Sequence, residues 1–319
     1  MNPSVLGQLT SSSSGHWRTS LTLCIVGISL LLGGCSGESE KAKETQTALD
    51  DSMESVQKYN GEGYALPYGN TTDKIAEANL DQIVDAGIKL FQENYKINVK
   101  VHNVVGAQDG ATIFVESEGE PHFYTYAVVP IDEKENKVMT EKVWADEFQV
   151  ENAIKGGLYH MIFKEEFSKL DNYLESVAAD GQVTGKTKVA LQNVGGQGFM
   201  TPYYFISMTS EELAIKHVYD LYKNNPHESI ENLRNAYDKT QFDPENFYIN
   251  IQYFMADEEA EPNKEIFNRV VKELEEMNSI PKGSYSVFLN DNLIDKQSAD
   301  GTKDNSLERS FPDYIIKDY

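Results

Sequence analysis

The side chains best suited to chemistry lie in the segment Gly119–Tyr126, which reads GEPHFYTY. The imidazole of His122 titrates near neutral pH, and Glu120 is close enough in sequence to raise its basicity. Tyr124 and Tyr126 follow at alternate positions, where their rings can wall a pocket. Two interpretations stay open. Either His122 and these three neighbours form a ligand pocket, or His122 closes a β-turn and has a structural role.

Other catalytic patterns are missing from the sequence. It has no G-x-S-x-G nucleophile elbow and no H-E-x-x-H metal motif. The nearest approach to the latter is His227 with Glu231, one helical turn apart, which we interpret as a solvated helix face. His102 and His160 lie in apolar-periodic stretches and are expected to be packed or at an edge. We therefore expect no catalytic residue, no metal and no cofactor.

The 319-residue chain carries a formal net charge of −23. Such a surface repels phosphate backbones, so we expect no nucleic-acid partner. The acidic run 257–261 and the polar run 290–292 lack the ligand spacing of an EF-hand. We interpret both as solvated loops, with calcium as the alternative.

The two cysteines of the chain, Cys24 and Cys35, lie near its N-terminus. Arg18 precedes an uncharged apolar run from Leu21 to Leu32, which is too short to span a bilayer but is typical of a secretory signal peptide. The run ends in LGGC, with Cys35 last, which resembles the lipobox of bacterial lipoproteins. The resemblance implies that the chain is cleaved before Cys35 and that Cys35 then carries a lipid, which includes palmitate. The expected location is the extracellular face of the cell membrane.

The sequence predicts three consecutive parts. Residues 1–34 form the lipoprotein signal peptide, and residues 35–60 form a flexible tether because they contain few large apolar side chains. Residues 61–319 form the folded lipoprotein domain. A glycine-rich stretch at 180–198 is a candidate subdomain boundary.

Hydrophobic periodicity predicts alternating helices and strands in the folded part. Expected helices cover 72–95, 147–178, 210–223, 228–239 and 262–277. Expected strands cover 97–105, 111–116, 122–131, 137–144, 199–208, 247–255 and 285–294. Runs of this kind indicate an α+β fold with helices packed on mainly antiparallel sheets, and leave two similar-sized subdomains as an option.

Several segments together resemble a known family. They are Tyr59–Leu66, Asn103–Ala107, Gly119–Phe123, Gly157–Tyr159 and Phe167–Leu174. They are similar to an uncharacterised family of Gram-positive, staphylococcal or bacillus-type surface lipoproteins, domain of unknown function 1672. The resemblance implies an extracellular lipid-anchored protein and supplies no catalytic residue.

The sequence thus predicts a non-enzymatic lipoprotein that is held to the membrane through Cys35. Its folded domain is expected to bind an unknown envelope protein or a small ligand. One alternative is an envelope hydrolase or metal-dependent enzyme centred on His122 and Glu120. Another is the solute-binding lipoprotein of a transporter, which would have two lobes with parallel sheets around a cleft.

Overall fold

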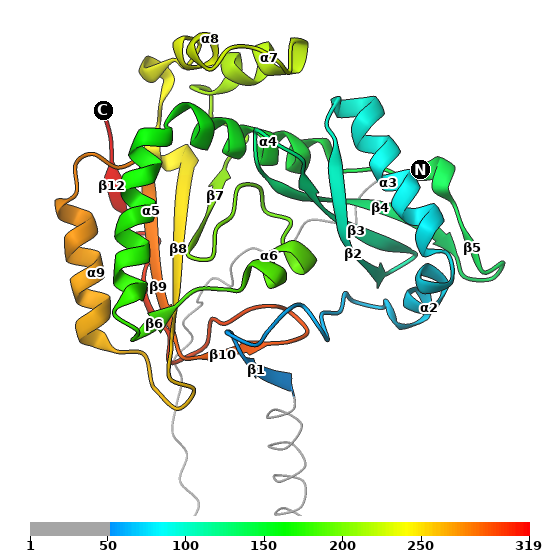
Figure 1. The fold of residues 1–319 in the computed structure, drawn as a ribbon, viewed down its shortest axis with the longest axis horizontal. Helices are drawn as coiled ribbons and strands as arrows, with labels where there is room; N and C mark the ends of the chain where they lie inside the picture. Colours follow the sequence, from blue (N-terminus) through cyan, green and yellow to red (C-terminus); the bar gives the residue numbers. More distant parts are fainter. Residues whose placement is uncertain (1–51) are drawn as a thin grey trace, which may run out of the picture. The chain divides into compact units, whose positions relative to one another are not determined.

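A four-stranded antiparallel sheet forms one half of the fold in the computed structural model, which describes residues 52–319 (Figure 1). Its strands run in the order β2 (Val99–Ala107), β3 (Gly110–Ser117), β4 (Tyr124–Asp132) and β5 (Lys137–Val138). The strand expected at 137–144 is shorter because a 3₁₀ turn, η1 (Thr140–Lys142), interrupts it.

Two helices, α2 (Asn70–Ala78) and α3 (Leu80–Tyr95), pack on this half. The sequence predicted one helix, but the chain breaks at Asn79, whose side-chain amide donates to the Ile75 carbonyl at 2.8 Å. An asparagine side chain that bonds its own backbone competes with the helical ladder, which explains the break. On α3, Gly87 lets the helix approach the sheet closely, since a Cβ there would lie 3.0 Å from Ile113 Cδ1.

A six-stranded sheet forms the other half. At its centre β8 (Phe247–Met255) pairs in parallel with β9 (Gly283–Asn290), and the other strand pairs of this sheet are antiparallel. The remaining strands are β6 (Val183–Thr184), β7 (Tyr204–Met208), β11 (Leu307–Arg309) and β12 (Ile315–Lys317). The parallel pair requires a crossover, which α9 (Lys264–Glu276) supplies.

Helices also connect the two halves. The predicted helix at 147–178 is two helices, α4 (Glu147–Ile162) and α5 (Lys164–Ala179). α4 contacts both β4 and β7, and α5 lies beside α9, where the Tyr173 hydroxyl donates to Glu273 (Figure 1). The short helices are α6 (Lys188–Val194), α7 (Lys216–Asn224) and α8 (Ile230–Asn235).

The main apolar core runs through both halves. Its buried side chains extend along the chain from Ile75 to Ile315 and come from both sheets. The segment 180–198 contributes Val183 of β6 to this core, whereas Ala190 of α6 packs with Tyr59 and Ile294 in a second, smaller cluster. The fold is α+β with mainly antiparallel sheets, as the sequence predicted.

The folded part begins earlier than residue 61. β1 (Met53–Ser55) pairs with β10 (Leu293–Asp295), and the buried Tyr59 donates its hydroxyl to the Lys296 carbonyl at 2.9 Å. Residues 53–60, which composition assigned to the tether, belong to the fold because this small sheet and one buried ring hold them. The signal peptide, Cys35 and the rest of the tether lie outside the described residues.

Smaller differences concern helix ends and faces. α7 begins at Lys216 and not at 210, so Leu213 lies before the helix; Leu213 is 50% exposed and Leu221 is 38% exposed. Within residues 52–319, no helix has both the length and the apolar character needed to cross a bilayer.

Candidate functional site

The carboxylate of Glu116 is the centre of a polar cluster inside the first half of the fold. Its Oε2 lies 2.7 Å from His102 Nε2 and 3.1 Å from Gln192 Nε2. Its Oε1 lies 2.9 Å from His122 Nε2 and 3.3 Å from the Tyr124 hydroxyl. We call these five residues the Glu116 cluster. They place four hydrogen-bonding groups around one carboxylate.

Strand register brings the members of the cluster together. Tyr124 of β4 is directly opposite Glu116 of β3. The pairing of β2 with β3 shifts between Val101 and Asn103, so His102 is the extra residue of a β-bulge. A bulge re-aims a side chain, and here the imidazole reaches the Glu116 carboxylate.

The loop before β4 fixes the position of His122. Ser117 Oγ donates to the Pro121 carbonyl and accepts from the Phe123 N–H, each at 2.9 Å. α4 closes on the same loop at Gly157, where a Cβ would lie 2.6 Å from the His122 carbonyl oxygen. The backbone around His122 is therefore held from both sides.

The four residues proposed from the sequence separate in the structure. His122 and Tyr124 belong to the Glu116 cluster. Glu120 instead accepts the backbone N–H of His122 at 3.2 Å, so the carboxylate on the imidazole is Glu116. Tyr126 is paired with Phe114 in the sheet and contacts Gly196.

Three members of the cluster were not among the site residues expected from the sequence. They are Glu116 on β3, His102 on β2 and Gln192 on α6, which lies in the glycine-rich stretch expected as a subdomain boundary. The available signal for Glu116 was that the expected strands 111–116 and 122–131 follow each other along the chain, and the observed register pairs Glu116 with Tyr124. The bulge at His102 and the approach of Gln192 depend on tertiary packing, for which the sequence offers no pattern.

The cluster holds Glu116 in its charged form. Burial raises the pKa of this carboxyl, but hydrogen bonds from both histidines and Gln192 outweigh burial and lower the pKa to about 2. The folded state therefore binds the Glu116 proton less tightly than the unfolded chain does. This part of the stability is present above pH 4.5 and is lost as the pH falls toward 2.

Glu116→Gln is expected to remove that part of the acid sensitivity. The free energy of unfolding of the wild-type protein should fall between pH 4.5 and 2 more steeply than that of the variant, because a glutamine has no proton to gain. Urea unfolding at a series of pH values measures this difference. Glu118→Gln, at an exposed glutamate in the next loop, is the matched control and should keep the wild-type slope. Equal slopes for wild type and Glu116→Gln would contradict the assignment.

A third histidine lies behind His122. The ring of His160 stacks on Phe199 with centroids 4.0 Å apart, and Phe199 meets the His122 ring edge-on at 6.0 Å. Burial lowers the pKa of His160 to about 4. His160 is thus a packed, neutral side chain at pH 7, as the sequence suggested, whereas His102 is a member of the polar cluster.

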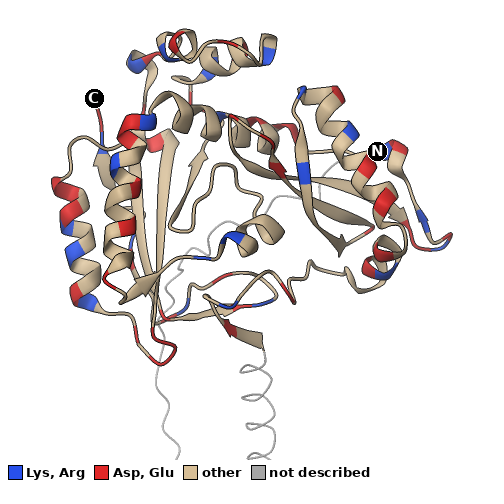
Figure 2. Ribbon diagram, in the orientation of Figure 1, with Lys and Arg blue, Asp and Glu red and all other residues tan. Residues whose placement is uncertain are grey.

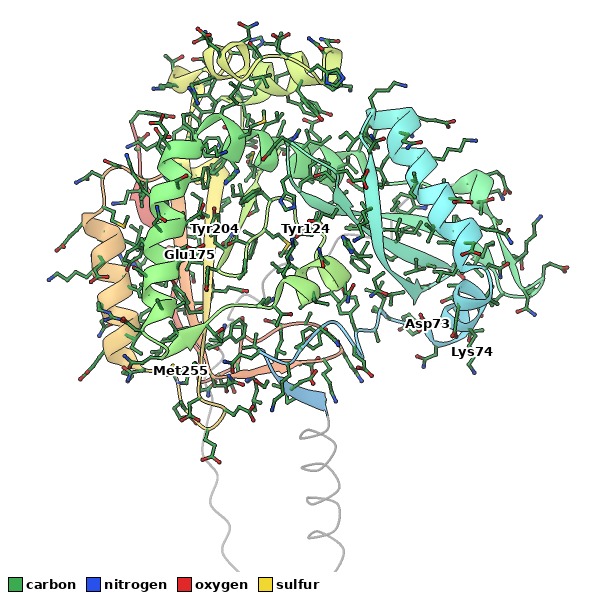
Figure 3. All side chains as sticks on the ribbon, in the orientation of Figure 1. Asp73, Lys74, Tyr124, Glu175, Tyr204 and Met255 are labelled. Carbon is green, nitrogen blue, oxygen red and sulfur yellow. The ribbon has the colours of Figure 1, made fainter. Side chains whose placement is uncertain are left out.

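The tyrosines on either side of the interior have different partners. Figure 3 labels Tyr124 on the first half and Tyr204 on the second. The Tyr204 hydroxyl donates to Asp171 at 2.9 Å and so does not join the Glu116 cluster.

A groove opens beside the cluster along β2. It has a volume of about 480 Å³, and His102 is one of its lining residues. Its other lining residues come from α2, α3 and the same strand: Asp73, Glu77, Leu80, Val84, Val101, Asn103 and Val104. We call it the β2 groove. Through His102, it is adjacent to the Glu116 cluster.

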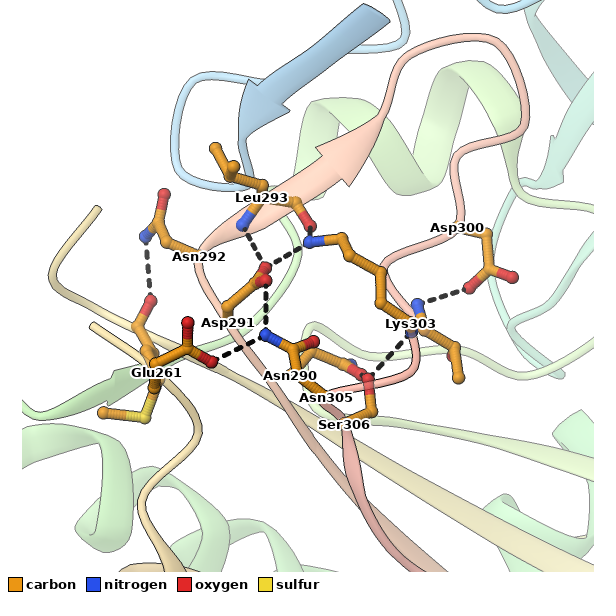
Figure 4. Close-up of polar contacts among 11 residues, drawn as sticks. Glu261, Asn290, Asp291, Asn292, Leu293, Asp300, Lys303, Asn305 and Ser306 are labelled. Carbon is orange, nitrogen blue, oxygen red and sulfur yellow. Dashed lines mark hydrogen bonds and ion pairs between the residues drawn. The ribbon is translucent and has the colours of Figure 1, made fainter. Parts of the chain in front are cut away.

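Acidic loops elsewhere are engaged within the protein. Asp291 pairs with the ammonium of Lys303, which also donates to the Leu293 carbonyl at 2.8 Å (Figure 4). Asn305 bridges Asp291 and Glu261 through its amide. An ammonium group thus occupies the place where a cation would sit at the polar run 290–292. Among residues 52–319, no group of three or more His, Cys, Asp or Glu side chains is arranged to hold a metal ion.

Comparison with known proteins gives a family and a fold. The chain is similar to the crystal structure of a DUF1672 family protein from Staphylococcus aureus, with a TM-score of 0.66 and 19% sequence identity over 84% of this chain and 99% of that chain. No curated protein matches the sequence. The model of the family described as "Protein of unknown function (DUF1672)" matches residues 46–317, so the chain belongs to the DUF1672 family.

Proposed function

We propose that this protein is a lipoprotein of the extracellular face of the cell membrane, anchored through a lipid on Cys35, whose folded domain is a binding module. The observation that carries the anchor is the sequence: a positive residue, Arg18, an apolar run of 12 residues and then Leu32–Cys35. Cys35 lies 17 residues before the first described residue. A segment of that length and composition can serve as a tether.

The Glu116 cluster supports a binding role over a catalytic one. Each oxygen of its carboxylate already faces two hydrogen-bonding groups, so the carboxylate orients imidazoles and is not free to accept a substrate proton. The neighbouring hydroxyl, Ser117 Oγ, is occupied by backbone groups of the His122 loop. The oriented imidazole of His122 stays 32% exposed, which suits ligand recognition.

The anchor is tested by metabolic labelling with an alkyne fatty acid. We expect wild-type protein to carry the label and Cys35→Ala to lose it completely, because the thiol is the only acceptor in the proposal. Cys24→Ala is the matched control, since it removes the other cysteine and should keep the label. Label that persists in Cys35→Ala, or loss of label in both variants alike, would overturn the anchor.

A further inference from the structure

The floor of the β2 groove is apolar and partly open to solvent. Leu80 and Val84 from α3 face Val101 and Val104 from β2, and Leu80 is 45% exposed. At about 480 Å³, the groove has the size of a site for a small ligand or a few side chains of a peptide. Apolar surface that stays exposed in a groove is stabilised by an apolar occupant.

The rim of the groove on α2 is acidic. Asp73 and Glu77 line it, and Glu77 is exposed without a partner among the described residues. Figure 2 marks Asp and Glu positions in red along both helices, α2 and α3. Across residues 70–95 there are five acidic side chains and two basic ones: Asp73, Glu77, Asp81, Asp85 and Glu93 against Lys74 and Lys89. Lys100 is the basic side chain of the neighbouring strand β2. Carboxylates therefore dominate the field at the groove.

Side chains engage part of the β2 edge beside the groove. Asn103 Oδ1 accepts the N–H of Val104 at 2.9 Å, and Asp73 accepts the N–H of Gly106. Thr72 Oγ1 donates to the Ala107 carbonyl at 2.8 Å. Because these three edge groups are engaged, we expect an occupant to be recognised through its side chains and not by extending the sheet.

Charge decides which occupant fits. The residues that precede the described part, 36–51, contain five acidic and two basic side chains, so the acidic rim repels the protein's own tether. A second copy of the chain carries the same net charge of −23 and is repelled as well. The complementary occupant is a segment with positive charges for the rim and aliphatic groups for the floor.

We propose that the β2 groove binds a cationic peptide segment in which lysine or arginine residues alternate with aliphatic residues. The inference rests on the proposed binding role and names its ligand class. The aliphatic side chains pack against Leu80 and Val84, and a cationic side chain pairs with Glu77. His102 joins the groove to the Glu116 cluster, so the cluster fixes one wall of the site.

Isothermal titration calorimetry of the full chain in a neutral detergent tests the proposal, with a detergent-only blank. The probe is a capped peptide of alternating lysine and leucine, seven residues long. Comparison peptides replace every leucine by serine or every lysine by glutamate. We expect binding of the lysine–leucine peptide and at least about tenfold weaker binding of both comparison peptides, because each lacks one of the two contacts.

Two matched pairs of variants locate the site. Glu77→Lys should weaken binding about tenfold, whereas Asp85→Lys, the same charge change at an exposed position on α3 outside the groove, should change it less than about twofold. Leu80→Ser should weaken binding, and Leu221→Ser, at a similarly exposed leucine of α7, should not. Glu77→Gln replaces Glu77→Lys if the lysine variant does not fold.

Equal effects of Glu77→Lys and Asp85→Lys would show attraction to the whole acidic surface and overturn the groove as the site. Binding of the lysine–serine peptide as tight as that of the lysine–leucine peptide would do the same. Because the titration does not depend on the lipid, its failure is distinguishable from failure of the Cys35 labelling experiment.

Discussion

Gly157→Ala is expected to destabilise the folded state by about 2 kcal/mol, the usual scale of overpacking in a well-packed interior. A Cβ at this position would lie 2.6 Å from the His122 carbonyl oxygen and 3.0 Å from Pro121 Cβ. Because the nearest obstacle is backbone, the His122 loop must move. That movement lengthens the 2.9 Å contact between His122 and Glu116, so one substitution on α4 should disturb the Glu116 cluster.

Gly156→Ala is the matched control on the same helix. A Cβ there would meet Phe199 N at 3.5 Å, an ordinary van der Waals distance. Alanine is the better helix former, so this variant should be neutral or more stable by up to about 1 kcal/mol. Urea midpoints compare the two variants, and the imidazole NMR signals of His122 report on the cluster. Equal urea midpoints for the two variants, with unchanged His122 signals, would show that the His122 loop accommodates the added methyl group and would contradict the prediction.

Glu212→Gln is expected to stabilise the protein at pH 8 by about 1–3 kcal/mol, because a buried charge is replaced by a neutral group. Glu212 is 2% exposed, its Oε2 accepts the Ala214 N–H at 2.7 Å, and its Oε1 has no partner among residues 52–319. Burial raises the pKa of this carboxyl to about 7, against the weaker opposing effects of the Ala214 N–H and Lys155.

The pH dependence of that effect follows from the raised pKa. The folded state holds the Glu212 proton more tightly than the unfolded chain, so its contribution is fully present below pH 4.5 and is lost as the pH rises through about 7. A shift from 4.5 to about 7 corresponds to about 3 kcal/mol. The advantage of Glu212→Gln should therefore grow over this range and vanish near pH 4.

His160 acts in the opposite direction. Its pKa falls from 6.5 to about 4 on folding, so its contribution is present above pH 6.5 and is lost as the pH falls through 4. Between pH 4.5 and 6.5 the two groups have opposite effects on the pH dependence of the free energy of unfolding. In Glu212→Gln only the effect of His160 remains, so the free energy of unfolding should rise with pH over this range. Glu211→Gln, at the exposed neighbour, is the control and should leave the wild-type profile unchanged. A profile of Glu212→Gln parallel to wild type would contradict the assignment.

Elements with a strong local pattern were predictable from the sequence. The strand expected at 247–255 is β8, with the same bounds, because buried residues alternate with half-buried ones from Phe247 to Tyr253. The helix expected at 262–277 is α9 at Lys264–Glu276, where Asn263 caps the first turn through Glu265 and Ile266 N–H groups. Breaks inside long apolar patterns, such as Asn79, depend on one side chain and were missed.

The candidate site was only half predictable. The local run around His122 marked the loop and the strand that carry two of the cluster's five members. The carboxylate came from the opposite strand, and the sequence pattern does not fix the strand register that pairs Glu116 with Tyr124. Glu120, the nearer carboxylate, binds the backbone because side chains two residues apart in a turn reach a neighbouring N–H more easily than a neighbouring ring.

The pairing of β1 with β10 has a mechanical consequence. β1 forms a separate two-stranded sheet of three residue pairs and hydrogen-bonds to neither larger sheet. A pull applied through the N-terminal end of the chain therefore loads this small sheet first and then Tyr59, whose carbonyl accepts from Thr187 Oγ1 at 2.7 Å. Force can peel these residues away first, which lengthens the connection while the pairing of β8 with β9 stays intact.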